Sequence, residues 1–183
     1  ARELYGVLKS VSFHDAHLVA AGLIQSKSAQ IRSWALDEFC PVNAEEKEDV
    51  FKALQAEDDP AIKKKLLITL VKTKDAEVIQ RLFGIFNKGI FKNKLLLDMI
   101  TLCGAFKVVE AIPFLSSTLE RRPFLYTRAA RTLRVQSVLS LARIGTPEAI
   151  EYILASANDR DPSVKAMCKL ALGSGVDAAE KVK

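Results

Sequence analysis

The stretch DPSVK at residues 161–165 decides the fold, because it has the composition of a helix start. An Asp at the N-cap accepts hydrogen bonds from backbone amides that have no partner within the helix, and a Pro at the first helical position removes no needed donor. The same order of polar cap, Pro or Ala, variable residue, β-branched apolar residue and cation recurs in DPAIK at 59–63 and in SAQIR at 28–32. Three such starts in one chain predict an internal structural repeat.

The repeat is anchored by one apolar residue per unit. These anchors are Ile31, Ile62, Leu95, Leu133 and Val164, and they stand 31 to 38 residues apart. Between them, a Glu followed by Ala or Val and then Ile opens a further helix at 77–79, 110–112 and 148–150. A Glu in a first turn is favoured by the helix dipole. Each repeat is therefore predicted to be a pair of helices.

The apolar residues of these segments follow the spacing of an amphipathic helix, as Ile62, Leu66 and Leu70 do. No strand signal of comparable length appears. The predicted helices lie near residues 2–9, 13–25, 29–39, 44–56, 60–73, 75–87, 91–104, 107–120, 125–144, 147–157, 161–172 and 176–183.

A single hairpin of about 30 residues cannot bury its own apolar face, whereas stacked hairpins can. The predicted fold is therefore all-α, a right-handed α-solenoid of about five helical hairpins. At residues 161–166, 170–172 and 139–150 the sequence resembles HEAT repeats, in particular the short bacterial kind first noted in phycobilin lyases. A HEAT resemblance is specific for the fold and unspecific for function.

The resemblance also implies where side chains act. In HEAT proteins the second helix of each pair lines the concave face, and the Asp and the cation of the anchor hold neighbouring repeats together. It thus implies a structural role for four cations, Arg32, Lys63, Arg134 and Lys165.

We expect residues 1–183 to form one HEAT-like repeat domain that is a fragment of a longer protein. The chain begins with Ala1 rather than Met, and residues 176–183 look like the start of another helix. The three cysteines have neither the spacing of a zinc site nor that of a disulfide pair, which favours a reducing, cytoplasmic location. No apolar run approaches the ~20 residues of a membrane span.

Charge is unevenly distributed along the chain. Residues 1–61 carry 6 basic and 11 acidic side chains, whereas residues 62–183 carry 21 basic and 11 acidic ones. This asymmetry suggests an anionic partner or packing against another charged surface. An ordinary solvated surface with uneven charge is the alternative.

Two groups of residues are candidates for binding a partner. Cations on the second helices would line the concave face, and the long interval before Leu133 places two cations, a Pro and two aromatic residues in a connecting segment at 121–126. The alternatives are solvated cations and aromatic side chains that plug the seam between repeats. The candidates are Lys64, Lys65, Lys94, Arg121, Arg122, Phe124, Tyr126, Arg128 and Arg131.

The sequence contains no motif typical of an enzyme: no nucleophile elbow, Gly-rich phosphate loop or paired carboxylates. His14 and His17 share a helix face but are too few for a metal site, so neither metal nor cofactor is expected. HEAT-like deoxyhypusine hydroxylases bind iron through His-Glu dipeptides, and this chain has none. Trp34 is expected in the core rather than in a DNA-repair site.

These observations predict a non-enzymatic scaffold for protein binding. Its partner would carry an acidic or amphipathic segment, and binding would use the basic concave surface. Nucleic acid is the alternative, less favoured partner, because stacking aromatic residues are scarce on the basic helices.

Overall fold

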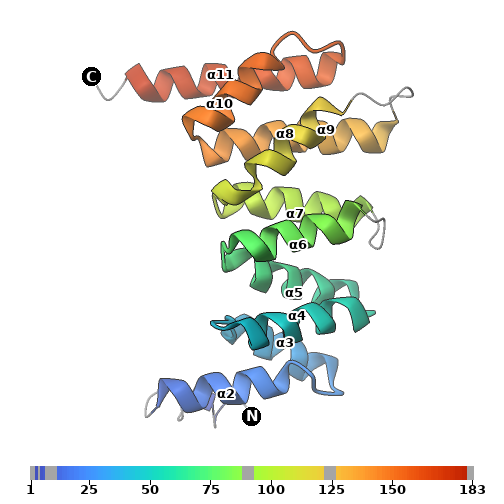
Figure 1. Ribbon diagram of the computed structural model, residues 1–183, viewed down its shortest axis with the longest axis vertical. Helices are drawn as coiled ribbons and strands as arrows, with labels where there is room; N and C mark the ends of the chain where they lie inside the picture. The colour runs from blue at the N-terminus through green and yellow to red at the C-terminus, as the bar shows by residue number, and fades with distance from the viewer. Residues whose placement is uncertain (1–2, 4, 7–11, 88–92, 122–126, 181–183) are drawn as a thin grey trace. The chain divides into compact units, whose positions relative to one another are not determined.

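A computed structural model describes residues 3, 5–6, 12–87, 93–121 and 127–180. Within these residues the chain forms ten α-helices and one short 3₁₀ helix, and no strand (Figure 1). The helices follow one another as pairs packed like HEAT hairpins, so the predicted all-α fold is confirmed. None of the described helices is both long and apolar enough to cross a bilayer.

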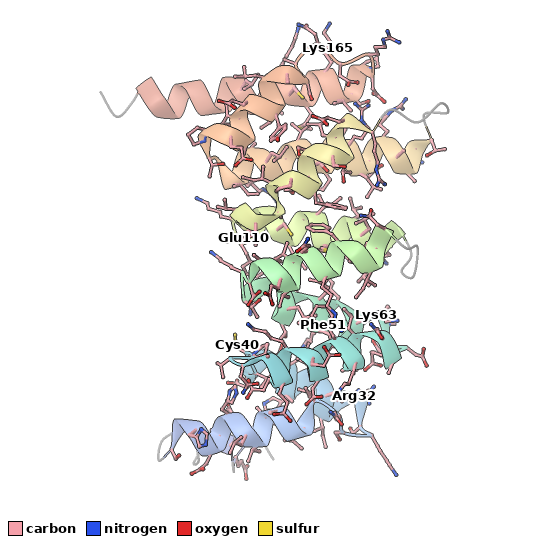
Figure 2. The ribbon with its side chains drawn as sticks, in the orientation of Figure 1. Arg32, Cys40, Phe51, Lys63, Glu110 and Lys165 are labelled. Atoms are coloured by element: carbon pink, nitrogen blue, oxygen red, sulfur yellow. The ribbon has the colours of Figure 1, made fainter. Side chains whose placement is uncertain are left out.

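The chain divides into two compact units, residues 1–73 and 74–183, and whether they behave as one domain stays a prediction. In unit 1, α2 packs on α3, α4 packs on α5, and the two second helices α3 and α5 pack on each other. Phe51, labelled in Figure 2, is 1% exposed and belongs to the core of this unit. Its helices are α2 (Phe13–Leu23), α3 (Ala29–Glu38), α4 (Ala44–Ala56) and α5 (Pro60–Lys72).

In unit 2 the helix α9 is the centre of the packing, because it contacts α7, α8, α10 and α11. The second helices α7, α9 and α11 therefore lie side by side, and α8 and α10 pack against α9 (Figure 1). The elements are α6 (Ala76–Asn87), α7 (Asn93–Ala105), η1 (Val109–Ala111), α8 (Ile112–Glu120), α9 (Arg128–Ile144), α10 (Pro147–Ala155) and α11 (Pro162–Glu180).

Local capping chemistry sets several helix starts, as the sequence predicted, although the side chain of Ser28 makes no cap hydrogen bond at the start of α3. The side chain of Asp59 accepts hydrogen bonds from the amides of Ala61 and Ile62, and Thr146 accepts one from the amide of Ala149. At the other end of α9, Gly145 adopts a left-handed φ of 71°, which a residue without a side chain does at little cost.

Three predicted boundaries differ from the structure. The helix expected near residues 107–120 begins as the 3₁₀ helix η1 at Val109, and α8 follows from Ile112. α9 begins at Arg128 rather than near residue 125, because Thr127 is the N-cap and accepts a hydrogen bond from the amide of Ala130. α11 runs without a break from Pro162 to Glu180, where two separate helices were expected. The glycines at 173 and 175 lower helix propensity by about 1 kcal/mol each relative to Ala, but unlike Pro they leave the backbone hydrogen bonds intact.

Candidate partner-binding surface

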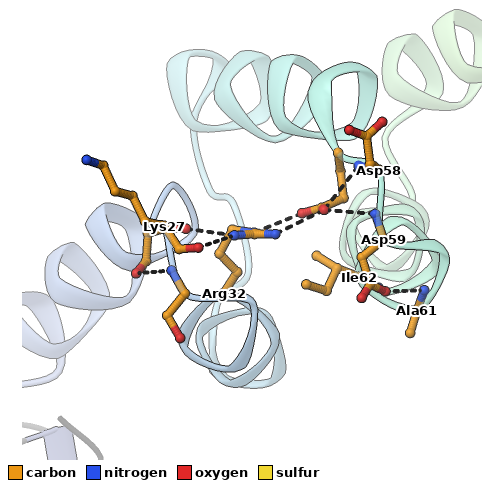
Figure 3. A network of polar contacts seen from close by, with 9 residues as sticks. Lys27, Arg32, Asp58, Asp59, Ala61 and Ile62 are labelled. Atoms are coloured by element: carbon orange, nitrogen blue, oxygen red, sulfur yellow. Dashed lines mark hydrogen bonds and ion pairs between the residues drawn. The ribbon is translucent and has the colours of Figure 1, made fainter.

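An arginine joins the two hairpins of unit 1 (Figure 3). Arg32 forms a two-pronged ion pair with Glu57, with Nε 2.8 Å from Oε2 and Nη2 3.0 Å from Oε1. Its Nη1 also donates to the carbonyls of Ser26 and Lys27. Burial raises the pKa of Glu57, but hydrogen bonds from Arg32 and from the amide of Asp59 outweigh it and hold that pKa below its usual value. Arg32 thus ties the α2–α3 connection to the α4–α5 connection.

Unit 2 repeats this arrangement in its last two hairpins. Arg134 is 2% exposed, and its Nη2 lies 2.6 Å from Oδ2 of Asp159. Its Nε donates to the carbonyl of Leu119. The two pairs have the same separation of 25 residues, and in each the acid stands two residues before the Asp that precedes Pro. Arg32 and Arg134 therefore hold neighbouring repeats together, as the HEAT resemblance implied.

Two of the predicted partner-binding cations are also engaged within the fold. Lys65 of α5 donates to both carboxylate oxygens of Asp37 on α3, at 2.7 and 2.6 Å, and to the carbonyl of Ser33. Arg131 of α9 donates from Nε to Asp161 at the start of α11, at 2.8 Å. Burial raises the pKa of Asp161, but the bonds from Arg131 and from backbone amides leave it lowered overall. Both cations therefore connect neighbouring second helices.

The other seven predicted residues differ in their surroundings. Lys64 is exposed on α5, in unit 1. Arg121 is exposed after α8, and its Nη2 lies 3.3 Å from Oδ1 of Asn87. Three candidates, Arg122, Phe124 and Tyr126, lie outside the described residues. This leaves Lys94 and Arg128, which the fold brings together.

Lys94 and Arg128 flank a shallow groove between α7 and α9. The groove has a volume of about 460 Å³, and its exposed lining is almost wholly apolar. Leu97 and Leu133 lie half-buried in its lining, and no described carboxylate lies within ion-pair distance of either flanking cation. The lining residues are Lys94 and Leu97 of α7 with Arg128, Ala129, Thr132 and Leu133 of α9.

One side of the groove is formed in part by an additional turn at the start of α9. The anchor residue is the third residue of α5, α7 and α11, whereas Leu133 is the sixth residue of α9. Part of the extra length before Leu133 is thus helical, within the helix predicted near residues 125–144. Residues 122–126 of the predicted connecting segment lie outside the described residues. Both Arg128 and Ala129 belong to this extra turn.

The helix ends add to the positive charge at the groove. An acid stands in the first turn of α2, α4, α6 and α10, whereas α7 and α9 carry none, as is also true of α3, α5, α8 and α11. The N-terminus of a helix behaves as a partial positive charge. Two such ends and two cations therefore meet beside one apolar surface.

Trp34 and His17, two other residues considered as possible site residues, make contacts within the fold. Trp34 is buried, as predicted, with Tyr5 packed edge-on at 5.2 Å between ring centroids. His17 bonds through Nε2 to Glu46 at 2.9 Å and stacks on Phe39, which links α2 to the start of α4. Within the described ranges, no three His, Cys, Asp or Glu side chains are grouped as metal ligands.

Comparisons with known proteins bear on the fold alone. No family model matches the chain, and no curated protein matches it in sequence. The structure of human deoxyhypusine hydroxylase in complex with glycerol is similar, with a TM-score of 0.54 at 14% identity over 89% of this chain. This chain covers 63% of that chain. At such low identity the likeness supports the HEAT-repeat arrangement of helix pairs.

Proposed function

We propose that the chain is a non-enzymatic, cytoplasmic protein-binding module of the short bacterial HEAT type, which holds a partner on the basic side of unit 2. The groove between α7 and α9 carries this proposal. It combines apolar lining with Lys94 and Arg128, which have no ion-pair partner among the described residues. Apolar contact supplies affinity to a protein interface, and complementary charge supplies specificity and rate of association.

Nucleic acid is the second candidate partner. The positive charge of residues 62–183 favours it, but two of the predicted cations, Lys65 and Arg131, already bond to carboxylates of the fold. Fewer cations then remain for phosphates, and no aromatic residue lines the described groove for stacking on bases.

The test is capture of partners from a cell lysate by wild-type protein and by the double variant Lys94→Glu/Arg128→Glu. Both changes place an acid in the first turn of a helix, which favours the helix, so the variant should melt no lower than wild type. A matched control, Lys107→Glu/Lys169→Glu, reverses two exposed cations elsewhere in unit 2.

The proposal would be supported by a discrete protein that stays bound after nuclease treatment to wild type and to the control variant but not to the groove variant. Capture of nucleic acid with steep salt dependence, about 10³-fold weaker between low and moderate salt, would replace it with the second candidate. Equal capture by all three forms would refute a role for the groove charges.

A further inference from the structure

The size of the groove limits what can occupy it. Its volume of about 460 Å³ falls in the range of sites for small ligands, roughly 300–1,000 Å³. The six residues that line it are far fewer than the roughly 20–30 residues that each partner contributes to a standard interface between folded proteins. The lining covers one turn of α7, from Lys94 to Leu97, and about one and a half turns of α9, from Arg128 to Leu133. A short segment of chain with one or two inserted side chains fits these dimensions.

We propose that the groove binds a short acidic peptide segment of a partner protein, in which bulky apolar side chains stand between carboxylates. This inference rests on the protein-binding function proposed above and specifies the partner's chemistry. The two cations belong to different sides of the groove, Lys94 to α7 and Arg128 to α9. A ligand that places an apolar group against Leu97 and Leu133 therefore meets a cation on each side.

The surroundings favour carboxylates over neutral polar groups at both flanks. The starts of α7 and α9 lack acidic residues in their first turns, so no carboxylate of those turns offsets the partial positive charge of either helix end. An anionic peptide would supply that missing charge.

A phosphate backbone fits the same site poorly. The lining is almost wholly apolar, so phosphates over it would lose water without gaining hydrogen bonds. Among the described residues that line the groove, two cations, Lys94 and Arg128, could neutralise phosphates, which predicts weak binding. An acidic peptide with an apolar centre matches both parts of the groove.

The inference can be tested with synthetic peptides and fluorescence anisotropy. The probe is a fluorescein-labelled peptide of sequence EEDLFDEE. A first control, EEDSSDEE, keeps the charge and lacks the apolar centre, and a second, KKRLFRKK, keeps the centre and reverses the charge. We expect saturable binding of the probe and at least tenfold weaker binding of both controls, which corresponds to about 1.4 kcal/mol or more.

Two protein variants separate the charged part of the groove from its apolar part. Lys94→Glu/Arg128→Glu should weaken probe binding at least about tenfold. Ala129→Phe should weaken it similarly by filling the groove from an exposed position, with both cations kept. The control Ala166→Phe adds the same side chain at an exposed position of α11 and should bind as wild type does. Circular dichroism melts verify that each variant is folded.

The outcomes distinguish this inference from the proposed function. No saturation by the probe up to about 1 mM, or equal binding of EEDLFDEE and EEDSSDEE, would overturn the inference. If the double variant nevertheless failed to capture a lysate protein that wild type captures, the proposed function would stand without the acidic-peptide inference. Probe binding that requires the groove, with no protein captured from lysate, would sustain the peptide chemistry and count against the proposed function.

Discussion

Gly104 is the position at which a single methyl group should separate two helices of unit 2. It lies in α7, where that helix packs on α9, and it is buried. A Cβ at this position would stand 2.7 Å from Cα of Ser140 and 2.8 Å from both Cβ and Oγ. Ordinary van der Waals contact begins near 3.4 Å, so the shortest of these distances falls short by 0.7 Å.

The cost of Gly104→Ala follows from two opposing contributions. Replacing Gly by Ala in a helix interior stabilises the helix by about 1 kcal/mol. Overpacking a well-packed site costs typically 1–3 kcal/mol, and the upper end applies because the obstructing atom is backbone. The hydroxyl of Ser140 is also held in place by donating to the carbonyl of Ile100 at 2.7 Å. We expect a net loss of about 2 kcal/mol in the free energy of unfolding.

The measurement is a pair of denaturant and thermal unfolding curves, in which this loss lowers the Tm by roughly 2–4 °C for each kcal/mol in a chain of this length. Gly84→Ala is the matched control, since Gly84 lies inside α6 of the same unit and nothing comes within 4 Å of an added Cβ. That variant should be more stable than wild type by about 0.5–1 kcal/mol. If Gly104→Ala stabilised the protein as much as Gly84→Ala does, the close crossing of α7 and α9 would be refuted.

Two further predictions concern the ion pairs between repeats. Arg134→Met removes the cation that pairs with the buried carboxylate of Asp159 and should lower the free energy of unfolding, measured in urea, by about 3–5 kcal/mol. Adding Asp159→Asn should recover part of this loss, because it removes the buried charge. An equal loss in the single and the double variant would contradict the coupling between the two residues. Stability should also fall in acid, because the folded state lowers the pKa of Glu46, Glu57 and Asp161 from ordinary values of 4.5, 4.5 and 3.8. As the pH falls, the unfolded chain binds protons at these carboxyl groups before the folded protein does. The contribution of the three carboxylates to stability is therefore complete above about pH 5 and is lost as the pH falls through their folded-state pKa values. Urea midpoints measured between about pH 6 and 3 should decline accordingly.

Local sequence chemistry predicted most of the fold, because helix starts depend on neighbouring residues. Caps such as Asp59 and Thr146 identify their helices without any tertiary information. The failures at 125–128 and 173–176 have the same origin, since local propensity there is ambiguous and the outcome depends on packing in the folded protein. Apolar residues before Thr127 resemble helix, and the glycines of α11 resemble a helix end.

The pairing of cations could be predicted only in part. The sequence does show that Arg32 and Arg134 each precede an acid by 25 residues, and that this acid stands two residues before an Asp-Pro start. That regularity is a usable signal for the bonds between repeats. No comparable spacing distinguishes Lys65 or Arg131, whose partners depend on how neighbouring second helices face each other.

The groove cations differ physically from the other cations at second-helix starts. A cation in a first turn opposes the helix dipole and costs about 0.3–1 kcal/mol. For Arg32 and Arg131 the fold offsets this cost with a carboxylate from the neighbouring hairpin. Lys94 and Arg128 have no such offset within the described chain, and they lie beside exposed apolar surface. Local conflicts of this kind concentrate at functional sites. An anionic partner bound there would relieve both the electrostatic conflict and the apolar exposure, which is why the groove carries the functional argument.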